Sequence, residues 1–153
     1  MKIKTLLPFL LSAFFCTPTF ARIGETEKQT DVRYGKPVLT RTESALRANA
    51  YRYKGFNIIV TFENGVSVME QFWKRNGLVM TPGELIGILA ANVGPSGRWG
   101  DPQQDGFMFY RHERNRFAEY NSLTGRLIIA VPDALKRVSG RINSADLAKM
   151  KGF

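Results

Sequence analysis

A single β-hairpin is the sequence feature that most constrains this fold. Residues 56–75 read FNIIVTFENGVSVMEQFWKR. They form two segments with the alternation of side chains that is typical of β-strands, joined by Asn64-Gly65. Asn-Gly is the strongest short signal for a two-residue hairpin turn, because both positions take a positive φ that these two residues tolerate. A turn at this point sets Glu63 opposite Val66, and it predicts the pairing of every residue farther along the two strands.

The predicted register divides the hairpin side chains between two faces, because successive side chains of a strand point to opposite sides. One face is strongly apolar and is expected to be core; it carries Phe56, Ile58, Val60, Phe62, Met69 and Trp73. The second face is mixed; it carries Asn57, Ile59, Thr61, Glu63, Val66, Val68, Glu70 and Phe72. A one-residue slip would exchange the faces, so the register decides which residues form the core.

The first 21 residues have the pattern of an export signal. Lys2 and Lys4 precede a short apolar run, and Thr19 and Ala21 suit a small-residue cleavage site. The apolar run is too short to span a bilayer comfortably. We therefore predict a signal peptide at 1–21, an exported chain that is periplasmic or secreted, and no integral membrane segment after cleavage.

Cysteine usage fits an exported domain that is held together by packing. Cys16 is the single cysteine of the 153-residue chain, and Phe15 stands before it where a lipoprotein signal has a small residue. We therefore expect no lipid anchor. The remaining chain, 22–153, has no cysteine, which excludes disulfides and cysteine-zinc sites in an oxidising compartment. Its length suits one domain.

Two helices are predicted from the residues at their ends. Thr26 and Gln29 have the spacing of a capping box and predict a helix at 27–34. Thr81, followed by proline, predicts the start of a helix at 80–92, whose apolar face should lie on a sheet. Both helices precede a series of alternating segments.

The whole pattern predicts an α+β fold: antiparallel β-sheet meanders with short helices packed on one face. The other expected elements are strands at 50–53, 107–112, 116–120 and 126–131, a strand or extended connection at 38–49, a surface loop at 94–106, and short helices at 133–138 and 145–150. This order fits a tandem helix-plus-meander repeat, 22–78 and 79–132, with a helical tail at 133–153. It equally fits a single domain whose elements recur.

One part of the sequence resembles a known group of exported domains. Gly24-Glu25-Thr26, the closing Gly35-x-Pro37 and the strands that follow resemble the β-lactamase-inhibitor-protein-like group, which includes the small outer-membrane assembly lipoproteins. The resemblance covers mainly residues 24–74. It implies helices on one sheet face and a protein-binding role through the other. The chain departs from the lipoproteins in lacking a lipidation signal, and from the inhibitors in lacking disulfide cysteines.

The residues for catalysis or metal binding are sparse. His112 is the single histidine and lies in an expected strand, where a lone histidine is usually structural or solvated. Asp101 to Gly106 superficially resembles a calcium loop, but it lacks the alternating ligands and the distal glutamate of such a loop. We therefore predict no catalytic residue, no metal site and no cofactor, and a protein that is not an enzyme.

Positive charge is the remaining chemical signal. The formal net charge is +9, and Arg111, Arg114 and Arg116 interleave with aromatic residues. In a cytoplasmic chain this basic patch would suggest nucleic acid. An export signal argues against nucleic acid and favours an unknown protein or an anionic envelope component as the partner; alternatively, the charges solvate the surface.

These features together predict an exported interaction module of the bacterial envelope that binds a protein through a sheet face. The predicted contact residues are Ile59, Thr61, Val66, Val68 and Phe72 on the mixed hairpin face, with Trp99 from the following loop. A small hydrolase acting on envelope polymers and a purely structural envelope protein stay open as alternatives. A helix or the second meander could also cover the mixed face, in which case no surface for a partner would be left there.

Overall fold

The structure, a computed structural model, describes residues 22–93, 98–101, 103–104, 108–112 and 116–141. Its elements are, in chain order, α1 (Glu27–Tyr34), β1 (Leu39–Glu43), β2 (Leu46–Tyr53), β3 (Phe56–Glu63), β4 (Val66–Lys74), α2 (Pro82–Ala91), β5 (Gln103–Gln104), β6 (Met108–His112), β7 (Arg116–Asn121), β8 (Arg126–Ala130) and α3 (Pro132–Arg141). The signal peptide predicted at 1–21 and the helix predicted at 145–150 lie outside the described residues.

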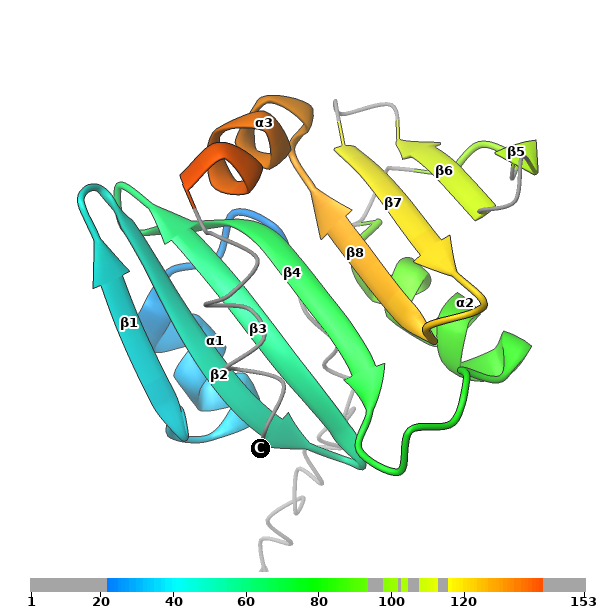
Figure 1. Ribbon diagram of the computed structural model, residues 1–153, viewed down its shortest axis with the longest axis horizontal. Coiled ribbons are helices and arrows are strands. Elements are labelled where there is room, and N and C mark those ends of the chain that lie inside the picture. Colours follow the sequence, from blue (N-terminus) through cyan, green and yellow to red (C-terminus); the bar gives the residue numbers. More distant parts are fainter. Residues whose placement is uncertain (1–21, 94–97, 102, 105–107, 113–115, 142–153) are drawn as a thin grey trace, which may run out of the picture.

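Within the described ranges, eight strands form one antiparallel sheet in the order β1-β2-β3-β4-β8-β7-β6-β5 (Figure 1). α1 precedes the meander β1 to β4, and α2 precedes the meander β5 to β8. The last strands of the two meanders, β4 and β8, pair in the middle of the sheet. The predicted α+β class with an antiparallel sheet is therefore confirmed. The pairing of β4 with β8 places Phe72 beside Leu127, which is far from it in sequence.

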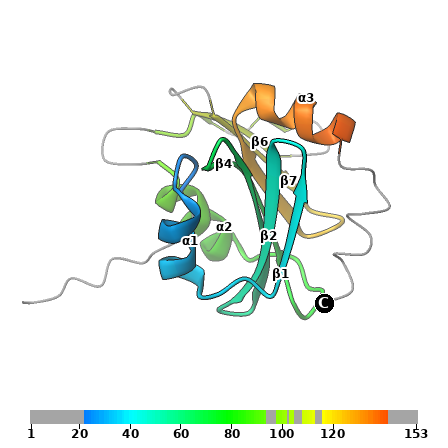
Figure 2. The ribbon, with the colours of Figure 1, turned by 90° about the vertical axis from the view of Figure 1, so that its left-hand side faces the viewer.

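α1 and α2 cover one face of the sheet, which we call the helix face (Figure 2). The main core lies here, because both helices and both meanders direct apolar side chains into the same layer. It includes Tyr34, Tyr51, Phe56, Ile58, Val60, Phe62, Phe72, Leu85, Ile88, Leu89, Ala118, Tyr120, Leu127 and Ile129. One continuous core therefore joins the two halves of the described chain.

α3 lies on the other side of the sheet, which we call the α3 face (Figures 1 and 2). Arg137 of α3 donates two hydrogen bonds to the Glu63 carboxylate at the end of β3, at 2.7 and 3.0 Å. Two smaller apolar clusters lie on this face, one around Leu46, Met69 and Ala130 and one around Ala48, Ala50 and Ile59. The expectation of helices on one face thus holds for α1 and α2, whereas α3 lies on the opposite side.

The central hairpin forms as predicted at its turn but not along its strands. Asn64 and Gly65 have φ values of 52° and 80°, and Glu63 pairs with Val66. A β-bulge then adds one residue, Val68, to β4, because the pairing passes from Phe62 with Ser67 to Thr61 with Met69. All later pairs are shifted by one residue relative to the prediction.

The bulge exchanges the faces of the rest of β4. Trp73 and Met69, predicted to be core beside Phe56, belong to clusters on the α3 face. Phe72 and Glu70, predicted on the mixed face, lie on the helix face, where Phe72 is part of the main core. The predicted assignment of these four side chains is therefore wrong, because an inserted residue reverses the alternation.

Contacts on both sides of β4 coincide with this bulge. Ser67 N–H donates to the Glu25 carbonyl at 2.8 Å, and Gly24 N–H donates to the Ser67 carbonyl at 2.8 Å. The Val68 carbonyl accepts a bond from Val131 N–H at 3.0 Å. The segment before α1 and the segment after β8 thus both bond β4 at the point where its regular pairing with β3 is interrupted.

Local signals placed the helices well. α1 begins after Thr26, whose capping box with Gln29 is complete. α2 begins after Thr81, where Thr81 N–H donates to Glu84 Oε2 at 2.7 Å and Glu84 N–H donates to Thr81 Oγ1 at 3.3 Å. These reciprocal bonds satisfy backbone donors that the first turn of a helix leaves without partners.

Some segments were less well predicted than α1 and α2. The ambiguous stretch 38–49 contains β1 and the start of β2, joined by a turn in which Ser44 has a φ of 54°. α3 extends over Pro132–Arg141, four residues longer than predicted. The expected surface loop at 94–106 is described only in part and includes β5.

Candidate functional site

The predicted contact residues of the central hairpin do not form one surface. Ile59 and Thr61 point to the α3 face, where both are buried. Phe72 lies on the opposite face and is buried in the main core. The bulge places Phe72 apart from the other two, so these three predicted contact residues do not share one face.

The remaining predicted contact residues are also dispersed. Val66 is exposed at the start of β4, and Val68 is half-buried at the bulge. Trp99 packs against the main core on the helix side, and its indole Nε1–H donates to the Leu89 carbonyl of α2 at 2.7 Å. These three residues therefore offer no contiguous patch with Ile59 and Thr61.

The predicted basic patch is described only at Arg116. Arg111 lies on β6, where only the backbone is described, and Arg114 lies outside the described residues. The Arg116 guanidinium donates to the Asn92 carbonyl at 2.8 Å and to the Ile23 carbonyl at 3.1 Å. Arg116 therefore joins β7 to the end of α2 and to the segment before α1.

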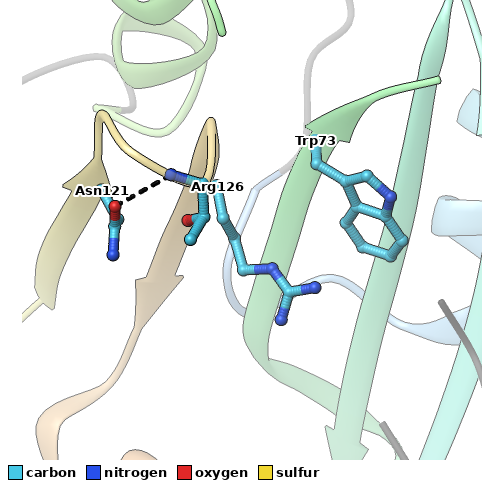
Figure 3. A pocket seen from close by; sticks show the side chains of 4 residues that line it. Trp73, Asn121 and Arg126 are labelled. Atoms are coloured by element: carbon cyan, nitrogen blue, oxygen red, sulfur yellow. Dashed lines mark hydrogen bonds between the residues drawn. The ribbon is translucent and has the colours of Figure 1, made fainter. Parts of the chain in front are cut away.

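A pocket of about 470 Å³ lies at one end of the sheet, lined by Trp73, Asn121, Thr124 and Arg126. Figure 3 shows the Arg126 side chain extending from β8 toward the Trp73 ring on β4. Trp73 belongs to the α3 face, and Arg126 follows the register that pairs Phe72 with Leu127, which places it beside Trp73. We call this hollow the Trp73–Arg126 pocket.

The sheet topology brings these four residues together from distant parts of the sequence. Trp73 lies near the end of β4, and Arg126 is the first residue of β8. Asn121 ends β7 and pairs with Arg126 across the β7–β8 turn that contains Thr124. The pocket therefore forms only where β4 and β8 meet, and each half of the chain supplies part of it.

The Asn121 side chain is held by the turn that follows it. Its Oδ1 accepts hydrogen bonds from the backbone N–H groups of Leu123 at 2.9 Å and Thr124 at 3.0 Å, the latter drawn in Figure 3. An amide oxygen bonded in this way turns the other end of the carboxamide, the Nδ2 donor, away from the turn. Asn121 thus contributes donor character to the pocket.

Arg126 is the central charged group of the pocket. Its guanidinium carbon lies 5.0 Å from the centre of the Trp73 ring, and Nη1 is 3.4 Å from Gln71 Oε1. Burial lowers the pKa of the Arg126 guanidinium from its usual value, because removing the cation from water disfavours the charged form. The face of the Trp73 indole attracts the cation and opposes this effect of burial.

Exposed aliphatic side chains lie at the same end of the sheet as the pocket. Leu123, in the turn that lines the pocket, is 90% exposed, and Leu78 and Val79 are 61% and 52% exposed. A Cβ added at Gly125 would be 3.2 Å from the Leu78 carbonyl oxygen and the Val79 Cα, so the two segments are in contact. We call Leu78, Val79 and Leu123 the apolar rim.

A second hollow, of about 420 Å³, lies beside α2 and is mainly apolar. It is lined by Ile86, Leu89, Ala90, Val93, Arg98, Trp99 and Gly100. Trp99 is fixed in its wall by the bond to the Leu89 carbonyl. Two of its lining residues, Val93 and Arg98, flank in sequence the residues 94–97, which lie outside the described chain. The Trp73–Arg126 pocket is therefore the candidate site.

A buried polar cluster lies on the helix face of β4, away from the pocket. Glu70 and Asn92 are both fully buried. Burial first, and then the nearby Glu25 carboxylate, raises the pKa of Glu70 to about 8, whereas Arg33, Asn92 and Arg116 oppose this shift. The carboxyl oxygen Glu70 Oε2 has no hydrogen-bond partner in the described structure. The cluster is buried within the fold and presents no surface at the Trp73–Arg126 pocket.

Sequence reasoning missed all four residues that line the pocket. Trp73 was assigned to the core because the predicted register lacked the bulge. The predicted strands at 116–120 and 126–131 leave a short connection between them, but nothing local indicates that β8 pairs with β4. The available signal was Arg126 itself, a charged residue directly after a turn and at the start of an apolar strand.

Comparison with known proteins shows a likeness of fold to a solved structure. No protein-family model and no curated protein matches the sequence. The fold is similar to that of a cysteine-rich secretory protein from Staphylococcus aureus, with a TM-score of 0.45 and 10% sequence identity. The match covers 74% of this chain and 46% of that chain, so this chain spans less than half of the staphylococcal protein. None of the helices in the described residues is long and apolar enough to cross a membrane.

Proposed function

We propose that this chain is an exported, non-enzymatic interaction module of the bacterial envelope, and that it binds a protein partner at the Trp73–Arg126 pocket and the apolar rim. The observation that carries the proposal is the guanidinium of Arg126, half-buried over the Trp73 ring in the wall of a 470 Å³ hollow. Tryptophan and arginine are the residue types most enriched where protein interfaces gain their binding energy.

The apolar rim supports a protein partner in particular. Single exposed aliphatic side chains are common on monomers. Here three of them lie on two contacting segments, next to a hollow that contains an aromatic ring and a cation. An apolar surround that excludes water around a central charged or aromatic anchor is the usual arrangement of a protein interface.

The sequence resemblance to the β-lactamase-inhibitor-protein-like group agrees with this proposal in kind. That group is expected to bind proteins through the sheet face that its helices leave uncovered. The Trp73–Arg126 pocket opens at the end of the corresponding face here, opposite α1 and α2. The centre of that face, around Ile59 and Thr61, is buried, so the proposed contact lies at the end of the sheet.

Site-specific crosslinking in the native envelope tests this proposal. A photoreactive benzoylphenylalanine at Leu123 reports on the apolar rim, and the same group at Val32 is a matched control. Val32 is 83% exposed on α1, on the helix side of the sheet. We expect a discrete crosslinked protein from position 123 and none from position 32. Equal crosslinking at both positions, or none at 123, would contradict the proposed contact surface.

A further inference from the structure

The charge of Arg126 lacks a carboxylate partner among the described residues. Its contacts are the Trp73 ring and one long bond to Gln71 Oε1. Among the other guanidinium groups of the described chain, several do have carboxylate contacts: Arg33 with Glu25, Arg47 with Glu27, and Arg137 with Glu63. A half-buried cation without an anion is unfavourable. An anionic group that enters the pocket would therefore stabilise the charge of Arg126.

The other polar groups of the pocket are complementary to the same kind of ligand. Asn121 Oδ1 is occupied by two backbone donors, which leaves the Nδ2 donor of that side chain. Thr124 adds a hydroxyl, and none of the four lining residues carries a carboxylate. A lining that offers donors around a cation selects an acceptor-rich, negatively charged group.

We propose that the Trp73–Arg126 pocket binds the carboxylate of an aspartate or glutamate side chain presented by the protein partner. The inference rests on the proposed function, and it specifies which chemical group of the partner the pocket binds. The occupant follows from charge complementarity: a guanidinium in the pocket without a carboxylate partner among the described residues, and a chain whose formal charge is +9 in full and +7 without Lys2 and Lys4 of the predicted signal peptide. The apolar rim then contacts the aliphatic part of the acidic side chain and its neighbours.

A carboxylate fits this pocket better than other polar groups do. Arginine presents its N–H groups as a planar fork that matches the two oxygens of a carboxylate. A sugar hydroxyl can bond to the Thr124 hydroxyl, but it carries no negative charge to match the Arg126 guanidinium. A phosphate dianion calls for more positive charge than Arg126 supplies, and Arg126 is the one cation among the described residues that line this hollow.

The test is a titration of the whole exported chain followed by ¹H–¹⁵N NMR, with the indole N–H of Trp73 as reporter. The probes are two capped tripeptides, one with glutamate and one with glutamine between two glycines, and inorganic phosphate. We expect saturable shifts of the Trp73 signal with the glutamate peptide, at a dissociation constant on the order of 1 mM. The neutral glutamine peptide should give no saturable shift.

Variants of Arg126 then identify the group that binds. Arg126→Lys keeps the charge but loses the fork, and it should weaken glutamate-peptide binding about tenfold, because a bidentate charged bond becomes a single one. Arg126→Gln should abolish saturation. Arg137→Gln is the matched control: it removes a positive charge on the same side of the sheet but outside the pocket, and it should leave the dissociation constant unchanged.

Each outcome decides the inference. The inference would be overturned by equal binding of the two peptides, by phosphate binding more tightly than the glutamate peptide, or by the absence of a saturable shift of the Trp73 signal. The comparison of the two peptides uses the unmodified chain, so it holds even if an Arg126 variant folds poorly. Crosslinking at Leu123 that persists in Arg126→Gln would leave the proposed function standing and reject the carboxylate inference alone.

Discussion

Asn92 accepts a hydrogen bond through Oδ1 from the Ile23 backbone N–H, at 3.2 Å and across 69 residues of sequence. The same side chain donates through Nδ2 to the Ile88 carbonyl at 3.3 Å, and its own carbonyl accepts from Arg116. Asn92 is completely buried. It therefore joins the segment before α1, the end of α2 and the start of β7 in one polar junction.

Replacing Asn92 with alanine should destabilise the fold by about 2–3 kcal/mol, because the buried Ile23 N–H would lose its acceptor. Chemical denaturation followed by circular dichroism measures this change. Asn76→Ala is a suitable comparison, since Asn76 is exposed and bonds only locally to Leu78 N–H. A loss no larger than that of the Asn76 variant would show that the junction contributes little to stability.

The pH dependence of stability should report on Glu70. Its folded pKa is about 8, above the ordinary value of about 4.3, so the folded state holds the proton more tightly than the unfolded chain. This contribution is fully present below the unfolded pKa, and it is lost as the pH rises toward 8. Between these values the free energy of unfolding should fall by up to about 1.4 kcal/mol per pH unit.

Glu70→Gln should remove that slope, because an amide stays neutral at every pH in this window. Urea unfolding at several pH values between 5 and 8 compares the two proteins. Glu43→Gln, at the exposed end of β1, serves as the control and should keep the slope. A Glu70→Gln protein with the same pH dependence as the parent would rule out Glu70 as its source.

Arg126→Gln should raise the free energy of unfolding by about 0.5–1 kcal/mol while it weakens binding of the glutamate peptide. The expected gain follows from the removal of a half-buried charge that lacks an anion among the described residues. Thermal unfolding and the peptide titration test the two effects on one protein. A marked loss of stability would instead assign Arg126 a structural role in joining β8 to β4.

Two glycines should respond to alanine in opposite directions. Gly125 has a φ of +64°, and its new Cβ would stand 3.2 Å from the backbone of Leu78 and Val79. Gly125→Ala should therefore destabilise the protein by about 1–3 kcal/mol. Gly83 lies in the first turn of α2 with nothing near its Cβ direction, so Gly83→Ala should stabilise the protein by about 0.5 kcal/mol. Melting temperatures of the two variants test this contrast.

The helices and strand boundaries were predictable from the sequence because their signals are local. Thr26 and Thr81 each form the capping box that their spacing predicts, and Asn64-Gly65 forms the predicted turn. The strands β6, β7 and β8 of the second meander also lie within one or two residues of the predicted ranges. In each case the residues that carry the signal lie within a few positions of the backbone conformation that they favour.

The faces and the candidate site were not predictable in the same way. The bulge at Val68 accompanies bonds to Glu25 and Val131, which lie far from it in sequence, so the hairpin alone does not reveal it. Arg126 meets Trp73 only because β8 pairs with β4. The sequence of one strand shows how its side chains alternate between the two faces. Which strands pair with it on either side depends on the fold of the whole chain.

The meeting of β4 and β8 also has a consequence for cohesion between the halves of the molecule. Four residue pairs connect these strands, from Met69 with Ala130 to Phe72 with Leu127, and the Trp73–Arg126 pocket lies just beyond the last pair. A ligand in this position contacts both meanders at once, and it bridges them where β4 pairs with β8. Its binding energy therefore adds to the energy that keeps the halves docked, and a partner that occupies the pocket also holds the sheet together.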